Sequence, residues 1–212
     1  MKIPKNILDN LLPYGLLLLL PFLYLVYTYS KRITSISHLP RNFKNFTFTG
    51  LVVSVGDGDG FRAVHLPLLR PGMNFLKEDS LPIRLAGVDA PEVRSFGKPA
   101  QTFSKEAKLY LKNLIDGKKV KIQILDIDHF NRIVAMVFIK SGFFSWKNIN
   151  LSMLDSGMAC VFRSRYTSFG GLEEQFYSRE SIAKSKKIGI WSDPNFINPQ
   201  EYKRKMKSAG PI

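Results

Sequence analysis

Three charged residues interrupt an otherwise apolar stretch, IRLAGVDAPE, at residues 83 to 92. Arg84, Asp89 and Glu92 place one guanidinium group and two carboxylates within a strand and the turn that ends it. Carboxylates bind hard cations such as calcium, and the planar guanidinium group binds phosphate through two parallel hydrogen bonds. Metal ions and guanidinium groups both stabilise the charge that develops on a phosphodiester during hydrolysis. These residue types therefore suit metal-assisted phosphodiester hydrolysis.

A second acidic motif precedes this stretch. The segment SVGDGDGFRAVH, residues 54 to 65, alternates Asp57 and Asp59 with three glycines between two strand-like runs. Glycine reaches positive φ without steric cost and aspartate bonds the neighbouring backbone, so the motif is typical of a tight hairpin. It does not fit an EF-hand loop, because Phe61 stands where a third oxygen ligand is needed. Taken alone, the motif leaves open a turn or a metal site.

The convergence of these groups depends on a bend in the chain. Successive strand residues face opposite sides, so Arg84 and Asp89 would point apart in an uninterrupted strand. They meet only if the chain bends near Gly87, and Pro91 then ends the strand. Arg132, after the segment DIDHFN, opens a later strand and supplies a second guanidinium group. The alternative is a structural ion pair between Arg84 and Asp89, which the pair alone does not exclude.

The elements that must position these residues are mostly strands. Short segments rich in β-branched and aromatic residues, bounded by Gly, Pro, Asp and Asn, are typical of strands. Five such segments occur, at residues 46–55, 61–66, 81–88, 119–125 and 132–139.

Helices are expected at three places. Between the third and fourth strands, Phe103, Ala107 and Leu111 recur at helical spacing before Gly117, which suits a helix C-terminus. Two shorter helices are expected at about residues 148–154 and 172–187. This order predicts a mainly β, α+β fold: a five-stranded OB-fold barrel over residues 46–191 with about three helices, although other α+β folds share the order. The basic tail at 192–212 is expected to be loosely ordered.

Composition limits the partner classes. The chain has 212 residues, 45% of them hydrophobic, which is enough for a packed core. Its net charge of +14, from 31 Lys and Arg against 17 Asp and Glu, attracts polyanions, chiefly nucleic acid or anionic lipid. The single cysteine, Cys160, excludes an intrachain disulfide, and no Cys/His cluster has zinc spacing.

The N-terminal region differs from the rest. Residues 11–29, LLPYGLLLLLPFLYLVYTY, contain no charge and as a helix would reach roughly 28 Å, close to the thickness of a bilayer core. The expectation is a transmembrane anchor between an N-terminal flank at 1–10 and a juxtamembrane linker at 30–45. The alternative is a cleaved signal peptide, for which TYSKR offers a poor cleavage site.

The ordered set of motifs resembles a known family. VVSVGDGDGFRA, IRLAGVDAPE, DHFNRIVAMVFI, LSMLDSGMACV and AKSKKIGIW follow each other as in the thermonuclease, or staphylococcal-nuclease-like, family, over roughly residues 47–191. With the hydrophobic N-terminus and the insertion at 65–82, the chain most resembles a group of fungal membrane-anchored probable endonucleases usually described as mitochondrial. This resemblance implies a single-pass membrane protein. The mitochondrion is the first expected location, and the endomembrane system is the second.

The resemblance implies a calcium-dependent phosphodiesterase acting on DNA or RNA, with an OB-fold. It assigns catalytic roles to Arg84, Glu92 and Arg132. It assigns the calcium to the carboxylates of Asp59 and Asp89 and the backbone carbonyl of Ala90. On this interpretation the acidic loop is both a hairpin and part of a metal site, and Asp57 belongs to the turn.

One region departs from the family pattern. After Val161 the sequence FRSRYTSFGG lacks the aligned tyrosine pair that packs against nucleotide in the classical enzyme. Tyr166 is a candidate replacement, and Arg163 and Arg165 are candidates for holding phosphate. His129 could be read as a general base, but a solvated hairpin residue is favoured.

Two classes of function remain. One is a membrane-tethered endonuclease, and the other is a non-catalytic OB module that holds nucleic acid or protein at a membrane. A binding scaffold has no reason to keep metal carboxylates and Glu92 together, so the sequence favours the enzyme.

Overall fold

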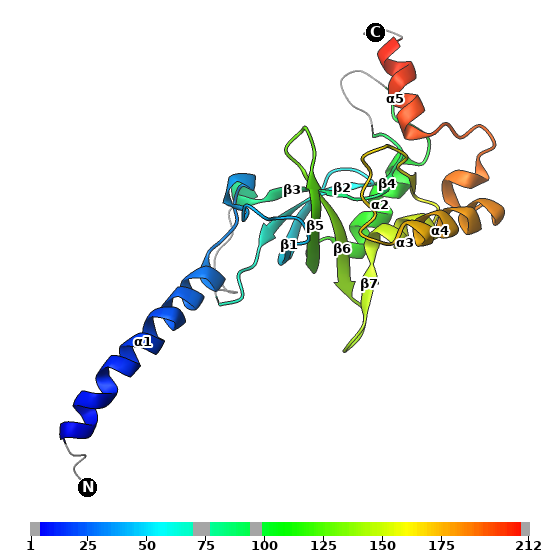
Figure 1. Cartoon of the computed structure of the whole chain (residues 1–212). Helices are drawn as coiled ribbons and strands as arrows, with labels where there is room; N and C mark the ends of the chain where they lie inside the picture. The colour runs from blue at the N-terminus through cyan, green and yellow to red at the C-terminus, as the bar shows by residue number, and fades with distance from the viewer. Residues whose placement is uncertain (1–4, 70–76, 94–98, 209–212) are drawn as a thin grey trace. The chain divides into compact units, whose positions relative to one another are not determined.

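The computed structural model describes residues 5–69, 77–93 and 99–208 (Figure 1). Parts of three predictions lie outside the described residues: 1–4 of the flank, 70–76 of the insertion and 209–212 of the tail. The chain divides into two compact units. One contains Met1–Arg32 and Leu66–Asn74, and the other contains Ile33–His65 and Phe75–Ile212.

The first unit consists mainly of helix α1, Lys5–Ser30. Its leucine-rich sequence favours a helix, because unbranched side chains lose little freedom there. Leu69 donates a backbone hydrogen bond of 3.3 Å to the carbonyl of Tyr29. Among the residues that the structure describes, no helix is both long and apolar enough to cross a membrane. The predicted transmembrane helix at 11–29 is thus not supported, although the segment is helical.

The second unit is built on a closed barrel of five strands. They are β1 (Thr47–Val55), β2 (Gly60–His65), β3 (Leu81–Leu85), β5 (Lys119–Ile127) and β6 (Ile133–Lys140). Antiparallel pairing gives the order β3-β2-β1-β5-β6, and a parallel pairing of β3 with β6 closes the barrel. In that pairing Arg84 lies opposite Val134. The barrel matches the five strands and the OB type expected from the sequence.

Smaller elements complete this unit. The third strand was expected to run to residue 88, but β3 ends at Leu85. The residues that follow the break form a separate strand, β4 (Val88–Asp89), which pairs with β8 (Cys160–Val161). Strand β7 (Trp146–Asn148) extends the sheet beside β6. The three expected helices are present as α2 (Ser104–Ile115), α3 (Ile149–Asp155) and α4 (Glu173–Ser185). Short 3-10 turns occur at Ile36–His38, Lys77–Asp79 and Gly189–Ser192.

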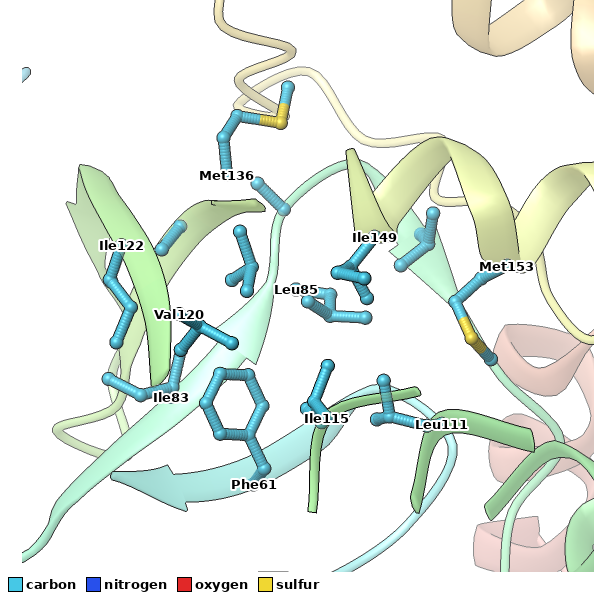
Figure 2. Packing of buried hydrophobic residues seen from close by; sticks show 14 of the residues in the cluster. Phe61, Ile83, Leu85, Leu111, Ile115, Val120, Ile122, Met136, Ile149 and Met153 are labelled. Carbon is cyan, nitrogen blue, oxygen red and sulfur yellow. The ribbon is translucent and has the colours of Figure 1, made fainter. Parts of the chain in front are cut away.

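The core lies between the barrel and helices α2 and α3. Figure 2 shows barrel side chains, including Phe61 and Ile83, together with Leu111 and Ile115 of α2. Each of these side chains is buried, as the alternating strand pattern and the helical spacing predict. Burial of each such side chain contributes about 1.5 to 3 kcal/mol.

One segment differs from expectation. The tail predicted to be loosely ordered contains a fifth α-helix, α5 (Pro199–Ser208). Its charged sequence, PQEYKRKMKS, carries a narrow apolar stripe of Pro199, Tyr202 and Met206 at helical spacing, which the composition of the tail obscures.

Candidate active site

The acidic loop between β1 and β2 is a tight hairpin that also delivers a carboxylate. The backbone N–H of Gly56 donates to the carbonyl of Gly60 at 3.0 Å, and Asp57 Oδ1 accepts a 3.1 Å hydrogen bond from the N–H of Asp59. Asp57 therefore stabilises the turn, as predicted. The side chain of Asp59 is buried and lies 2.9 Å from Arg84. Both interpretations of the motif are compatible with this geometry.

The predicted bend at Gly87 is present. Gly87 has a φ of +72°, and it separates β3, which carries Arg84, from β4, which carries Asp89. A Cβ atom at Gly87 would lie 2.6 Å from a ring carbon of Phe176, so space and conformation both require glycine. Buried Asn150 of α3 supports the bend by donating to the carbonyl of Ala86 at 2.8 Å.

This bend brings the three central charges together. Arg84 Nη2 donates a 2.9 Å hydrogen bond to Asp89 Oδ1. The same nitrogen lies 2.9 Å from Asp59 Oδ2 as an ion pair, outside hydrogen-bond geometry. Asp89 is fully buried and the Arg84 side chain is 13% exposed. The guanidinium group therefore links a carboxylate of the β1–β2 loop to one of strand β4.

Burial and charge oppose each other at this cluster. Burial raises the pKa of Asp59 well above its usual value, against the lowering effect of Arg84. Burial alone would lower the pKa of Arg84, but Asp59 and Asp89 outweigh it and raise the pKa. Within the described residues, Asp59 Oδ2 and Asp89 Oδ2 are buried without a hydrogen-bond partner. Two such oxygens suit a cation, because buried acceptors are otherwise hydrogen-bonded.

Glu92 follows β4 and is reached by two segments from later in the chain. Its backbone N–H donates to Gln101 Oε1 at 3.1 Å, and its carbonyl accepts from the Gln101 N–H at 2.9 Å. Its carboxylate Oε1 lies 2.7 Å from Lys203 Nζ of α5. Ala90, whose carbonyl was expected to bind metal, is buried beside Asp89.

Arg132 is held by its own turn. Asp128 Oδ2 lies 2.7 Å from Arg132 Nε, and Asp128 Oδ1 accepts the backbone N–H of Arg132 at 2.9 Å. Burial would raise the pKa of Asp128, but the hydrogen bonds from Arg132 and Phe130 lower it. No hydrogen bond within the described part of the chain uses the terminal nitrogens of Arg132. They are available to an anionic ligand.

A cavity of 820 Å³ contains most of the predicted site. The predicted residues that line it are Asp59, Arg84, Glu92, Arg132 and Tyr166. The structure thus brings Asp59, Arg84 and Asp89 into direct contact, and it places Glu92 and Arg132 on the walls of the same cavity. The exposed His129 also lies at this wall, stacked against Phe130.

The nucleotide-contacting candidates separate into two groups. Tyr166 is 85% exposed at the cavity wall, where a base can stack on it. Arg163 instead binds buried Glu180 through Nη2, so its guanidinium group has a structural partner. No local pattern indicates this pairing, because the two residues are 17 positions apart and Glu180 lies on α4.

Lys203 and Asp128 are the site residues that sequence reasoning did not single out. Lys203 stood within a run of tail lysines, and nothing in its spacing linked it to Asp89 or Glu92. Asp128 belongs to the segment DHFN, and nothing in that segment indicated that it would bind Arg132. In the described ranges, no group of three or more His, Cys, Asp or Glu side chains is arranged to hold a metal ion.

A closed five-stranded barrel with arginine and carboxylate groups at one cavity is the architecture of a nuclease-type OB-fold protein. The family model described as staphylococcal nuclease homologue matches residues 82–193, and the chain belongs to this family. The match confirms the resemblance seen in the ordered motifs.

Curated relatives extend the similarity over most of the chain. The chain is 36% identical to "Probable endonuclease LCL3" of Coccidioides posadasii, over 96% of this chain and 71% of the relative. It is 40% identical to the protein of the same name from Komagataella phaffii, over 78% of each chain. The Saccharomyces cerevisiae protein of that name is 32% identical, over 87% of this chain and 91% of the relative.

Proposed function

We propose that this protein is a calcium-dependent endonuclease that hydrolyses phosphodiester bonds of DNA or RNA by in-line attack of water. The observation that carries the proposal is the meeting of Asp59 and Asp89 at Arg84; Asp59 and Arg84 line the cavity together with Glu92 and Arg132, and Asp89 is buried behind them. Family membership and the names of the relatives support an endonuclease.

The metal site is proposed at the two buried aspartates. The family is metal-dependent. Asp59 and Asp89 each have a buried carboxylate oxygen that accepts no hydrogen bond in the described structure, and oxygen donors are what calcium prefers. The Asp59 oxygen, Oδ2, also forms the ion pair with Arg84. The carbonyl of Ala90 is the proposed third ligand. A calcium ion bound there would polarise a phosphate oxygen.

The remaining groups act on the water and the phosphate. Glu92, about one-third exposed, is placed to orient a water and to accept its proton. Arg84 and Arg132 hold the non-bridging phosphate oxygens and stabilise their growing charge. Asp59 and Asp89 fix the orientation of Arg84, and Asp128 fixes that of Arg132. Tyr166 offers a surface on which a base stacks.

The first experiment measures cleavage by the full-length chain. Labelled single-stranded DNA and RNA are incubated with the wild type and Glu92→Gln, in calcium, in magnesium and in chelator. The matched control is Glu174→Gln, an exposed glutamate of α4 outside the cavity lining. We expect calcium-dependent cleavage that Glu92→Gln abolishes and Glu174→Gln retains. Calcium-independent binding without cleavage would instead support the tethering module.

The N-terminal helix carries a separate proposal about location. Leu17, Leu18, Phe22 and Tyr24 of α1 are each more than 60% exposed, and contiguous exposed apolar residues mark interaction sites. We propose that α1 associates the nuclease with a membrane, with the mitochondrion as the first candidate and the endomembrane system as the second. Cell fractionation of the full chain beside a variant lacking residues 1–30 tests this; recovery of both in the same soluble fraction would refute it.

A further inference from the structure

Helix α5 forms part of the wall of the active-site cavity. Tyr202 Oη donates a 2.8 Å hydrogen bond to the carbonyl of Pro99, and Asn198 Nδ2 lies 3.3 Å from Cys160 Sγ. The side-chain amide of Gln101, which also binds the backbone of Glu92, donates to the carbonyl of Ile197. Two segments that follow Glu92, at residues 99–101 and at Cys160, therefore position the helix.

The helix inserts one cation between two site carboxylates. Lys203 Nζ lies 2.7 Å from Glu92 Oε1 and 3.3 Å from Asp89 Oδ1. Lys203 and Met206 both line the active-site cavity. An ammonium group is a compact point charge with three donors, so it can satisfy carboxylates that would otherwise bind a metal ion and a water.

The attachment of α5 is weak apart from these contacts. Among its residues with described side chains, only Pro199 is buried, and Lys205 pairs with Glu201 on the helix's own surface. Elements with few buried apolar contacts open locally at low free-energy cost. The helix can therefore leave the cavity without unfolding the barrel.

We propose that α5 is an autoinhibitory latch whose Lys203 ammonium competes with the divalent cation for the carboxylates of the site. This inference rests on the proposed metal-dependent function. In the latched form the Lys203 ammonium binds the carboxylates of Asp89 and Glu92, and α5 forms part of the cavity wall. Metal binding displaces the ammonium and releases the helix, so the metal and the latch exclude each other.

The latch lowers the apparent affinity for the metal. When only a fraction of molecules is competent to bind, the apparent dissociation constant rises in inverse proportion to that fraction. If the open form is about one-tenth of the population, removal of the latch charge tightens binding about tenfold. If Lys203 instead served to bind phosphate, calcium would not displace it from Asp89 and Glu92. The position of α5 would then be independent of calcium.

The test measures calcium affinity and the position of α5 separately. Isothermal titration calorimetry gives the calcium affinity of the full-length chain, kept in solution with a non-ionic detergent. Hydrogen exchange of the α5 amides with and without calcium reports whether the helix is released. The variants are Lys203→Met, which removes the charge, and Lys203→Arg, which keeps it. Lys205→Met is the matched control, because Lys205 lies on the same helix and pairs with Glu201.

We expect Lys203→Met to bind calcium about tenfold more tightly, while Lys203→Arg and Lys205→Met stay near the wild type. Calcium should remove the exchange protection of α5 in the wild type, and Lys203→Met should show low protection without calcium. Two results would overturn the latch and leave the metal site intact. One is equal calcium affinity of Lys203→Met and the wild type, and the other is tighter calcium binding while the α5 amides stay protected from exchange. If neither the wild type nor Lys203→Met bound calcium or magnesium, the proposed metal site would fail, and the latch with it.

Discussion

Replacement of Arg132 by alanine separates the proposed catalytic role from a structural one. Arg132 uses Nε to contact Asp128 at 2.7 Å, which leaves its terminal nitrogens for the substrate. Loss of one preorganised group that stabilises transition-state charge costs on the order of 10² to 10³ in rate, or about 2.7 to 4 kcal/mol. We therefore expect Arg132→Ala to lose cleavage by at least about 100-fold.

The stability cost of the same change should be small. The Arg132 and Asp128 side chains are 28% and 15% exposed, so solvent only partly screens the pair and its loss should cost on the order of 1 to 2 kcal/mol. Asp128 still accepts the N–H of Phe130 at 2.9 Å, which preserves the turn. A loss of 1 kcal/mol lowers the Tm of a domain this size by about 2 to 4 °C.

The assay is single-turnover cleavage of labelled single-stranded DNA in saturating calcium, with thermal unfolding measured on the same preparations. Arg179→Ala is the control, because Arg179 also pairs with a carboxylate, Asp155, at 2.9 Å and is 45% exposed outside the cavity lining. Cleavage by Arg132→Ala within a few-fold of Arg179→Ala, at comparable Tm, would refute the assigned role.

Two further predictions concern the framework of the site. Gly87→Ala should destabilise the protein by about 2 to 5 kcal/mol and reduce cleavage, because it adds left-handed backbone strain and overpacking against Phe176. Denaturant unfolding measures the free energy of unfolding, and a decrease below about 0.5 kcal/mol would contradict this prediction. Burial would raise the pKa of Glu180, but hydrogen bonds from Arg163, the Val161 N–H and Lys184 lower it. The stability from Glu180 is therefore full above its unfolded pKa near 4.5 and is lost as pH falls through the lower folded value. Thermal unfolding from pH 7 to pH 3 should show the advantage of the wild type over Glu180→Gln shrinking below about pH 4.5, and a constant difference would contradict this.

The features that sequence predicted are those with local causes. The barrel strands and helices α2 to α4 follow from residue spacing, because alternation and helical periodicity decide which face is buried. The bend at Gly87 followed from the alternation of side chains along a strand, because Arg84 and Asp89 would otherwise point to opposite faces. The hairpin at the acidic loop likewise followed from its glycines and Asp57.

The features that sequence missed depend on contacts between distant segments. Helix α5 is mostly polar and charged, and hydrogen bonds such as that from Tyr202 to Pro99 hold it in place. Lys203 looks like any tail lysine until the fold carries it to Asp89, 114 positions earlier. Arg163 likewise seemed free for phosphate, because its pairing with Glu180 exists only after α4 packs against β8.

The parallel pairing of β3 with β6 has a consequence for when the enzyme can act. Arg84 lies opposite Val134 in that pairing, and Arg132 directly precedes β6, so the two arginines share a cavity only when this seam is closed. A chain whose seam has opened has all its charged side chains but no arranged site. Cleavage activity should thus disappear with the opening of the seam, before the rest of the barrel unfolds, so an incompletely folded molecule is harmless to the nucleic acids around it.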